Sequence, residues 1–268
     1  MCCPRTRCRA ACSNDTPFTT REAPLHLSIV TGSSRGLGLA LTEQLLQRGH
    51  RVLGIARGET APPVPAGGEL IAWRVDLADP VPVAARLQQW LAGQPAPASA
   101  TLVNNAGVVS TPGPLADADL AELSAAVRVG LEAALLTTAA FLRATSAWPV
   151  PRKVVLVSSG LGRRAMAGSA SYCAAKAGMD HLARAVALEE GGRPNCARIV
   201  SLAPGIIDTD MQVTLRTADP ARFPERDRFL GFKTAGQLDS PAAAAAKLLR
   251  YLDRPDFGSN PVGDVREA

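Results

Sequence analysis

The chain has 268 residues, of which 47% are hydrophobic and 20% charged, and its formal net charge is +5. This length suits one large α/β domain that buries a sizeable core. The arginines are scattered rather than gathered into a basic stripe, so we expect no nucleic-acid partner. No uninterrupted apolar run of about 18 residues occurs, so we also expect no membrane-spanning helix and no membrane partner.

The first 24 residues differ from the rest of the chain in their cysteine content. Cys2, Cys3, Cys8 and Cys12 lie there, and only two further cysteines follow. A disulfide framework would be spread over the fold, and no histidine completes a zinc-binding spacing. The arginines of this segment resemble a transit peptide only faintly, and no long apolar run marks a secretory signal. We predict a disordered tail over 1–24, no metal site and a cytoplasmic protein.

From residue 25 onward, short apolar runs alternate with helical patterns. Strands are expected at 25–30, 51–56, 70–75, 101–103, 154–157 and 198–202, and helices at 39–47, 84–91, 120–145, 171–189 and 241–252. Ser240 and Pro241 are typical of the start of the last helix, and Pro261 interrupts a final short strand. This alternation predicts one Rossmann-type domain over 25–268, with a doubly wound parallel sheet flanked by helices on both faces.

A longer connection, residues 211–238, precedes the last helix and is rich in arginine, aspartate and phenylalanine. Long ordered connections often cover binding sites, so we predict that this segment is a lid.

A glycine-rich run, Thr31-Gly32-Ser33-Ser34-Arg35-Gly36-Leu37-Gly38, joins the first expected strand to the first expected helix. Glycines at such a place let the backbone turn tightly and approach a pyrophosphate at a helix N-terminus. A tight surface turn is the other interpretation of such a run. Its position directly after a strand favours a dinucleotide site.

The second expected strand indicates which dinucleotide is bound. It ends at Ala56-Arg57 and carries no acid for the ribose 2′-hydroxyl that distinguishes NAD. Arg57 and Arg35 can instead hold a 2′-phosphate, which favours NADP(H), although both arginines are alternatively only solvated. Asp76 follows the third expected strand and is a candidate partner for the adenine edge.

Tyr172 and Lys176 are one helical turn apart and therefore share a helix face. A nearby ammonium charge would lower the pKa of the phenol, which can then exchange a proton with an alcohol oxygen. Ser159 follows the fifth expected strand, at the sheet edge where ligands bind in this architecture. Taken alone, a tyrosine and a lysine at this spacing are usually surface residues of a helix.

The combined pattern resembles the short-chain dehydrogenase/reductase family from residue 27 to about residue 264. The resemblance includes Asn104-Asn105-Ala106-Gly107 and Pro204-Gly205, in family order with the motifs above. It implies that Ser159 polarises a carbonyl, that Tyr172 is the general acid in reduction, and that Lys176 tunes Tyr172 and holds the nicotinamide ribose. The implied cofactor contacts are Gly32, Ser34, Arg35, Gly36, Leu37, Gly38, Arg57, Asp76, Leu77, Asn104, Ala106, Gly107, Tyr172, Lys176, Pro204, Gly205, Ile207 and Thr209.

One position departs from the family pattern. Gly130 stands in the helix expected at 120–145, where family members usually carry an asparagine that supports a water-linked proton relay to the lysine. We expect an altered relay, because the backbone carbonyl remains and can still hold a water. Relatives often pair through helices equivalent to 120–145 and 171–189, so the resemblance allows a homodimer.

A narrower resemblance, to the benzil reductase and sepiapterin reductase-like branch, rests on the run from Pro204 to Gln212 together with Tyr172-Cys173 and Arg228-Phe229-Leu230. It implies NADPH-dependent reduction of a small-molecule ketone or diketone. Two alternatives stay open: a 3-oxoacyl-thioester reductase of the same family, and a non-catalytic NADP-binding sensor. The residues expected to line an apolar substrate pocket are Met166, Ile206, Met211 and Leu215.

Overall fold

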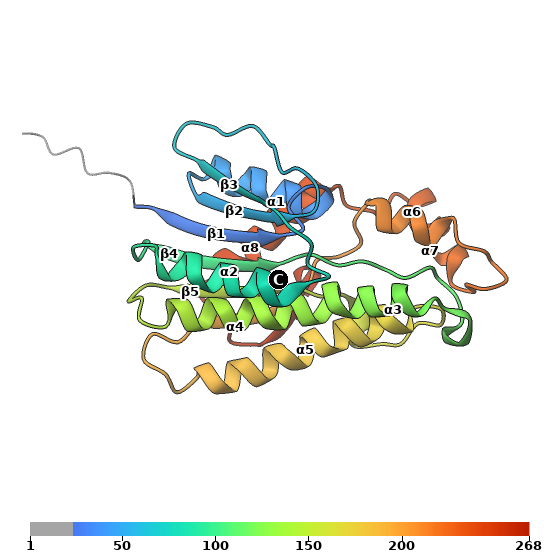
Figure 1. Ribbon diagram of the computed structural model, residues 1–268. Coiled ribbons are helices and arrows are strands. Elements are labelled where there is room, and N and C mark those ends of the chain that lie inside the picture. The colour runs from blue at the N-terminus through green and yellow to red at the C-terminus, as the bar shows by residue number, and fades with distance from the viewer. Residues whose placement is uncertain (1–23, 268) are drawn as a thin grey trace, which may run out of the picture.

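The computed structural model describes residues 24–267 (Figure 1). The tail predicted for residues 1–24 lies outside the described residues, except for its last member.

Seven parallel strands form the central sheet, in the order β3-β2-β1-β4-β5-β6-β7. Chain order reverses between β1 and β4, which are neighbours in the sheet, so the crevice that binds ligands in open α/β sheets is expected beyond their carboxyl ends. The predicted doubly wound parallel sheet is confirmed. The strands are β1 (His26–Thr31), β2 (Arg51–Ala56), β3 (Glu69–Arg74), β4 (Ser99–Asn104), β5 (Arg152–Val157), β6 (Arg198–Ala203) and β7 (Val262–Asp264).

Helices cover both faces of this sheet (Figure 1). Successive side chains of a strand point to opposite faces. On β1, Ile29 therefore joins the core beneath α2, α4 and α5, while Val30 joins the core beneath α1 and α8. The helices are α1 (Gly36–Gln47), α2 (Pro80–Ala92), α3 (Leu120–Val127), α4 (Ala133–Thr145), α5 (Ala170–Glu190), α6 (Asp210–Arg216), α7 (Arg226–Thr234) and α8 (Pro241–Asp253).

Most expected elements are present with shifted ends. Ser240 accepts a hydrogen bond from the Ala243 amide at 3.1 Å and so caps α8, as its position predicted. The helix expected at 84–91 begins earlier, at Pro80, because proline suits the first helical turn. The last strand, β7, begins directly after Pro261, which has no amide hydrogen to donate to the sheet.

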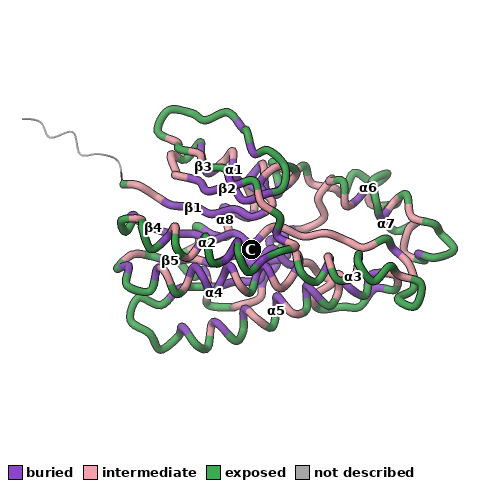
Figure 2. Tube along the Cα trace, viewed as in Figure 1, coloured by how far each residue is buried: buried purple, intermediate pink, exposed green. Residues whose placement is uncertain are grey.

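The single long helix expected at 120–145 is interrupted. Residues Arg128–Glu132 form a π-helical turn, η2, between α3 and α4, and Gly130 is buried within it. The combined stretch Leu120–Thr145 is long and apolar enough to cross a membrane, a property that core helices share. Here it packs against α2 and α5, and the inward side of α4 is buried (Figure 2). We therefore interpret this helix as part of the core.

The predicted lid segment projects beyond the sheet as α6 and α7 (Figure 1). It has a small apolar core of its own, in which Leu215, Phe223 and Phe229 pack against Met166. The two phenylalanine rings are stacked with centroids 5.8 Å apart. Whether the segment opens and closes over a ligand stays a prediction.

Candidate active site

A cavity of about 1200 Å³ extends along the carboxyl edge of the sheet, from the glycine-rich loop to α6 and α7. It brings together the predicted catalytic residue Ser159 and most of the predicted cofactor contacts. The predicted contacts that line it are Gly32, Ser34, Arg35, Gly36, Leu37, Arg57, Asp76, Leu77, Ala106, Gly107, Tyr172, Lys176, Pro204, Gly205, Ile207 and Thr209.

The glycine-rich loop has the backbone shape for which its glycines were singled out. Gly32 and Gly36 have φ angles of 68° and 54°, in the left-handed region that side chains disfavour. Gly38 does not line the cavity, because it lies directly behind the loop. A Cβ at Gly38 would be 2.1 Å from the Gly32 carbonyl oxygen, so glycine is required for α1 to pack this closely. The loop thus leads the chain into the N-terminus of α1 at the cavity wall, a place suited to an anion.

Asn104 is a second predicted contact that does not line the cavity. Its side chain is 2% exposed, donates to Thr138 Oγ1 at 3.0 Å and accepts from Thr137 Oγ1 at 2.8 Å. It therefore holds β4 against α4. The neighbouring Asn105, which the predicted set left out, does line the cavity, and its Nδ2 donates to the Thr31 carbonyl at 3.0 Å. The run Asn104-Asn105-Ala106-Gly107 was the sequence signal for it.

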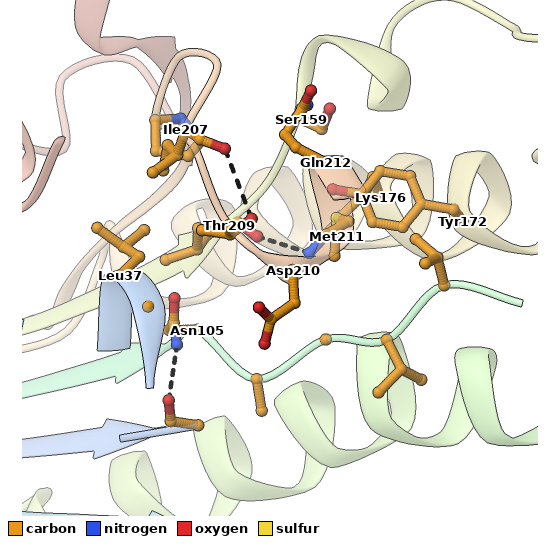
Figure 3. Close-up of a pocket in the computed structure, with 18 of the residues that line it drawn as sticks. Leu37, Asn105, Ser159, Tyr172, Lys176, Ile207, Thr209, Asp210, Met211 and Gln212 are labelled. Carbon is orange, nitrogen blue, oxygen red and sulfur yellow. Dashed lines mark hydrogen bonds between the residues drawn. The ribbon is translucent and has the colours of Figure 1, made fainter. Parts of the chain in front are cut away.

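Tyr172 and Lys176 face the cavity from α5, across from Ser159 at the end of β5 (Figure 3). The Lys176 Nζ atom lies 5.5 Å from the centroid of the Tyr172 ring and donates to the Val157 carbonyl at 2.7 Å. The Ser159 Oγ accepts from the Leu161 amide at 3.2 Å, which orients the hydroxyl. A phenol, an ammonium group and a hydroxyl therefore meet at one end of the cavity.

Burial is the main influence on the pKa values of Tyr172 and Lys176. Desolvation raises the pKa of Tyr172 to about 12, while the neighbouring Ser159 hydroxyl acts in the opposite direction. Lys176 is not among the influences that set this pKa, so the lowering that the sequence suggested is not found, and desolvation disfavours the phenolate. Desolvation also lowers the pKa of Lys176 to about 8, opposed by the negative charge of Asp180. Near neutral pH the phenol is therefore protonated, as a general acid must be.

Asp180 was not singled out from the sequence, yet it organises the wall behind the catalytic residues. Its carboxylate is 1% exposed and accepts from Ser158 Oγ at 2.7 Å and from Ser201 Oγ at 2.6 Å. Arg163 Nε approaches its other oxygen at 3.3 Å. The available signal was its spacing, because Asp180 follows Lys176 by four residues and so shares its helix face.

The rim at the adenosine end carries the arginines expected to choose the cofactor. Arg35 and Arg57 both line the cavity and are exposed. Arg35 Nη1 pairs with Asp210 Oδ2 at 3.0 Å, so its charge is partly shared. Asp76 also lines the cavity, and its Oδ1 accepts from the Ala78 amide at 2.9 Å.

The other end of the cavity is lined largely by apolar residues, with Arg228 of α7 among them. All four residues expected there, Met166, Ile206, Met211 and Leu215, line it. Sequence reasoning missed Phe229 and Phe232 as lining residues and Gln212 beside them, all from the predicted lid. An aromatic or otherwise apolar ligand fits such walls.

Comparison with known proteins agrees with this geometry. A model of the short chain dehydrogenase family matches residues 27–220. The chain is 32% identical over 243 residues to a benzil reductase ((S)-benzoin forming) of Bacillus cereus, covering 88% of this chain and 96% of that protein. It is 32% identical over 261 residues to the sepiapterin reductase of Rattus norvegicus, covering 86% and 92%. The predicted resemblance to this branch is confirmed.

Solved structures give the same result. A short-chain dehydrogenase/reductase from Burkholderia vietnamiensis is 37% identical, with a TM-score of 0.60 over 91% of this chain and 98% of that one. A putative NAD(P)-dependent gluconate 5-dehydrogenase from Beutenbergia cavernae, solved with bound NADP, is 26% identical, with a TM-score of 0.72 over 90% and 94%. The chain therefore belongs to the short-chain dehydrogenase/reductase family of NAD(P)(H)-using oxidoreductases.

Proposed function

We propose that the protein is an NADPH-dependent carbonyl reductase that converts an aryl ketone or a 1,2-diketone to the alcohol. The observation that carries this proposal is the cavity itself, which joins a loop suited to a pyrophosphate to Tyr172, Lys176 and Ser159 and ends in apolar walls. The similarity to benzil reductase and sepiapterin reductase supports the choice of substrate class.

Each residue of the catalytic end has a separate task in this reaction. A nicotinamide cofactor, when held by the predicted contacts, would supply the hydride that the carbonyl carbon accepts. The Ser159 hydroxyl donates a hydrogen bond to the carbonyl oxygen, and Tyr172 gives that oxygen its proton, so hydride and proton together complete the alcohol. Lys176 places a positive charge beside the phenol and stabilises the phenolate that remains.

The preference for NADP(H) over NAD(H) is part of the proposal. β2 ends without an acid, and the exposed Arg35 and Arg57 stand at the cavity rim, where a 2′-phosphate would make charge-assisted hydrogen bonds. Such bonds contribute about 1.5–3 kcal/mol each. We expect Arg57→Ala to weaken NADP⁺ binding about ten-fold or more and to leave NAD⁺ binding unchanged. Arg250→Ala, exposed on α8 outside the cavity, is the matched control.

The decisive assay follows NADPH absorbance with benzil, beside NADH and a Tyr172→Phe variant. Loss of NADPH that requires both benzil and Tyr172 would support the proposal. Without benzil turnover the substrate assignment is wrong, and a pterin, quinone and oxoacyl panel is the next test. A 3-oxoacyl-thioester reductase is the second candidate, because the FabG reductase of Pseudomonas aeruginosa is 31% identical over 236 residues. Tight cofactor binding with no turnover on any carbonyl would favour the non-catalytic sensor.

A further inference from the structure

Gln212 carries a polar amide beside the apolar residues of α6 and α7 that line the cavity. The residue lies in the first turn of α6, is 8% exposed and lines the cavity that also holds Ser159 and Tyr172 (Figure 3). Among residues 24–267, its side-chain oxygen Oε1 is buried and has no hydrogen-bond partner.

Local structure does not account for this amide. The Gln212 backbone N–H donates to the Thr209 carbonyl at 2.9 Å, so the start of α6 forms without the side chain. The apolar side chains around this end of the cavity, which include Met211, Leu215 and Phe229, carry no hydrogen-bond donor. Arg228 also lines the cavity, and Arg216, one helical turn after Gln212, has a buried Nη1 without a partner, but neither guanidinium donates to Gln212 Oε1. A buried polar atom without a partner is costly and rare in folded proteins. A bound ligand is therefore the natural source of the missing partner.

A primary amide can both donate and accept, so it recognises either a carbonyl or a hydroxyl oxygen. We propose that Gln212 is a specificity-determining residue that hydrogen-bonds a second oxygen of the substrate, beside the carbonyl that is reduced. The site accordingly selects vicinal diketones and α-hydroxy ketones over simple ketones. This inference rests on the proposed reductase function and narrows its substrate class.

Benzil and 1,2-diphenylethanone form a suitable substrate pair, because they differ only in the second carbonyl oxygen. Benzil is the more reactive electrophile in any enzyme, so the informative quantity is how the ratio of the two kcat/KM values changes between variants. We expect Gln212→Leu to lower this ratio, benzil over 1,2-diphenylethanone, about ten-fold, which corresponds to about 1.4 kcal/mol. Gln212→Met, closer in shape, should give the same loss.

Two controls separate this role from the alternatives. Thr214→Val changes an exposed residue of the same helix and should leave the ratio unchanged. The dissociation constant of NADP⁺ should be the same in wild type and Gln212→Leu. If the cofactor binds more weakly and the substrate ratio stays constant, Gln212 contacts the nicotinamide rather than the substrate, and the inference is wrong.

Failure of the inference can be told apart from failure of the proposed function. If wild type reduces benzil in a Tyr172-dependent way but the ratio is the same in Gln212→Leu, only the inference is overturned. If wild type reduces neither compound, the proposed assignment to aryl ketones and 1,2-diketones fails. The inference is then decided by calorimetric binding of the two compounds to the NADP⁺-loaded protein. An equal binding ratio in wild type and Gln212→Leu would overturn it, and a lower ratio in the variant would support it.

Discussion

Ketone reduction is expected to be lost as pH rises, and replacing Asp180 by asparagine should move this alkaline loss to a lower pH. The negative charge of Asp180 raises the pKa of Lys176, which burial has lowered to about 8. Without that charge the pKa falls further, and the positive charge of Arg163, no longer paired, acts in the same direction. Lys176 is charged below its pKa and neutral above it, so the charged form is lost as pH rises. In the variant this loss begins at a lower pH.

The same substitution should have a moderate cost in stability. Two hydroxyls, from Ser158 and Ser201, donate to the Asp180 carboxylate at 2.7 and 2.6 Å. Hydrogen bonds to a charged group contribute about 1.5–3 kcal/mol and neutral ones about 0.5–1.5, so neutralising the acceptor costs about 1 kcal/mol per bond. The total of about 2 kcal/mol lowers Tm by roughly 4–8 °C in a chain of this size. Asparagine is preferred to alanine because it keeps an acceptor for both hydroxyls.

The assay is the pH dependence of kcat/KM for reduction of the best ketone substrate, between pH 6 and 10. Tyr172, whose pKa is raised to about 12, stays protonated over this range, so the alkaline limb reports Lys176. Asp256→Asn is the control, since that exposed acid pairs only locally with Arg254. If Asp180→Asn lowered Tm but left the alkaline limb in place, Asp180 would be a structural residue without electrostatic influence on Lys176.

Three further predictions concern other parts of the fold. Gly130→Asn should lower the free energy of unfolding by about 1–3 kcal/mol, because the new Cβ would lie 3.2 Å from the Ala175 Cβ. If the proton relay is altered as expected, the same substitution should change the pH dependence of turnover, and an unchanged pH profile contradicts that idea. Burial lowers the pKa of His50 to about 4, so protonation of this histidine should cost the protein roughly 1 kcal/mol of stability as pH falls from 6.5 toward 4. In urea titrations at several pH values, His50→Asn should make this loss of stability smaller. Ser240→Ala should lower the free energy of unfolding by about 1 kcal/mol with activity retained, and an unchanged urea midpoint would show that the α8 cap contributes nothing.

The parts of the fold that were predictable are those where short-range constraints fix the residue type. A strand buried on both faces must be apolar along its length, so Val154 to Val157 indicated β5 directly. Glycines with positive φ, Gly32 and Gly36, are required by a tight turn before a helix and therefore mark the loop in the sequence. Element ends were less predictable, because caps and the first turn depend on neighbours in space.

The unpredicted interactions share a different property, because they depend on partners far away in the chain. Arg35 pairs with Asp210 across 175 positions, and the Asp180 carboxylate joins β5 and β6. The π-helical turn at Gly130 was not predicted either, because a turn of five residues is too short to establish a period of its own. Such features follow from packing, and local pattern carries little information about them.

This difference explains why the family could be predicted more securely than the substrate. The cofactor end is built from strand ends and one loop, where backbone geometry dictates glycine, asparagine and proline at fixed spacings. The substrate end is built by α6 and α7, short helices whose side chains are constrained mainly by what they enclose. Within that end, the Gln212 amide oxygen is buried and finds no partner in the described chain, so its surroundings do not explain it. Substrate choice should therefore respond to substitutions in α6 and α7 while cofactor binding does not, and exchanging these two helices for those of a relative is the direct way to change it.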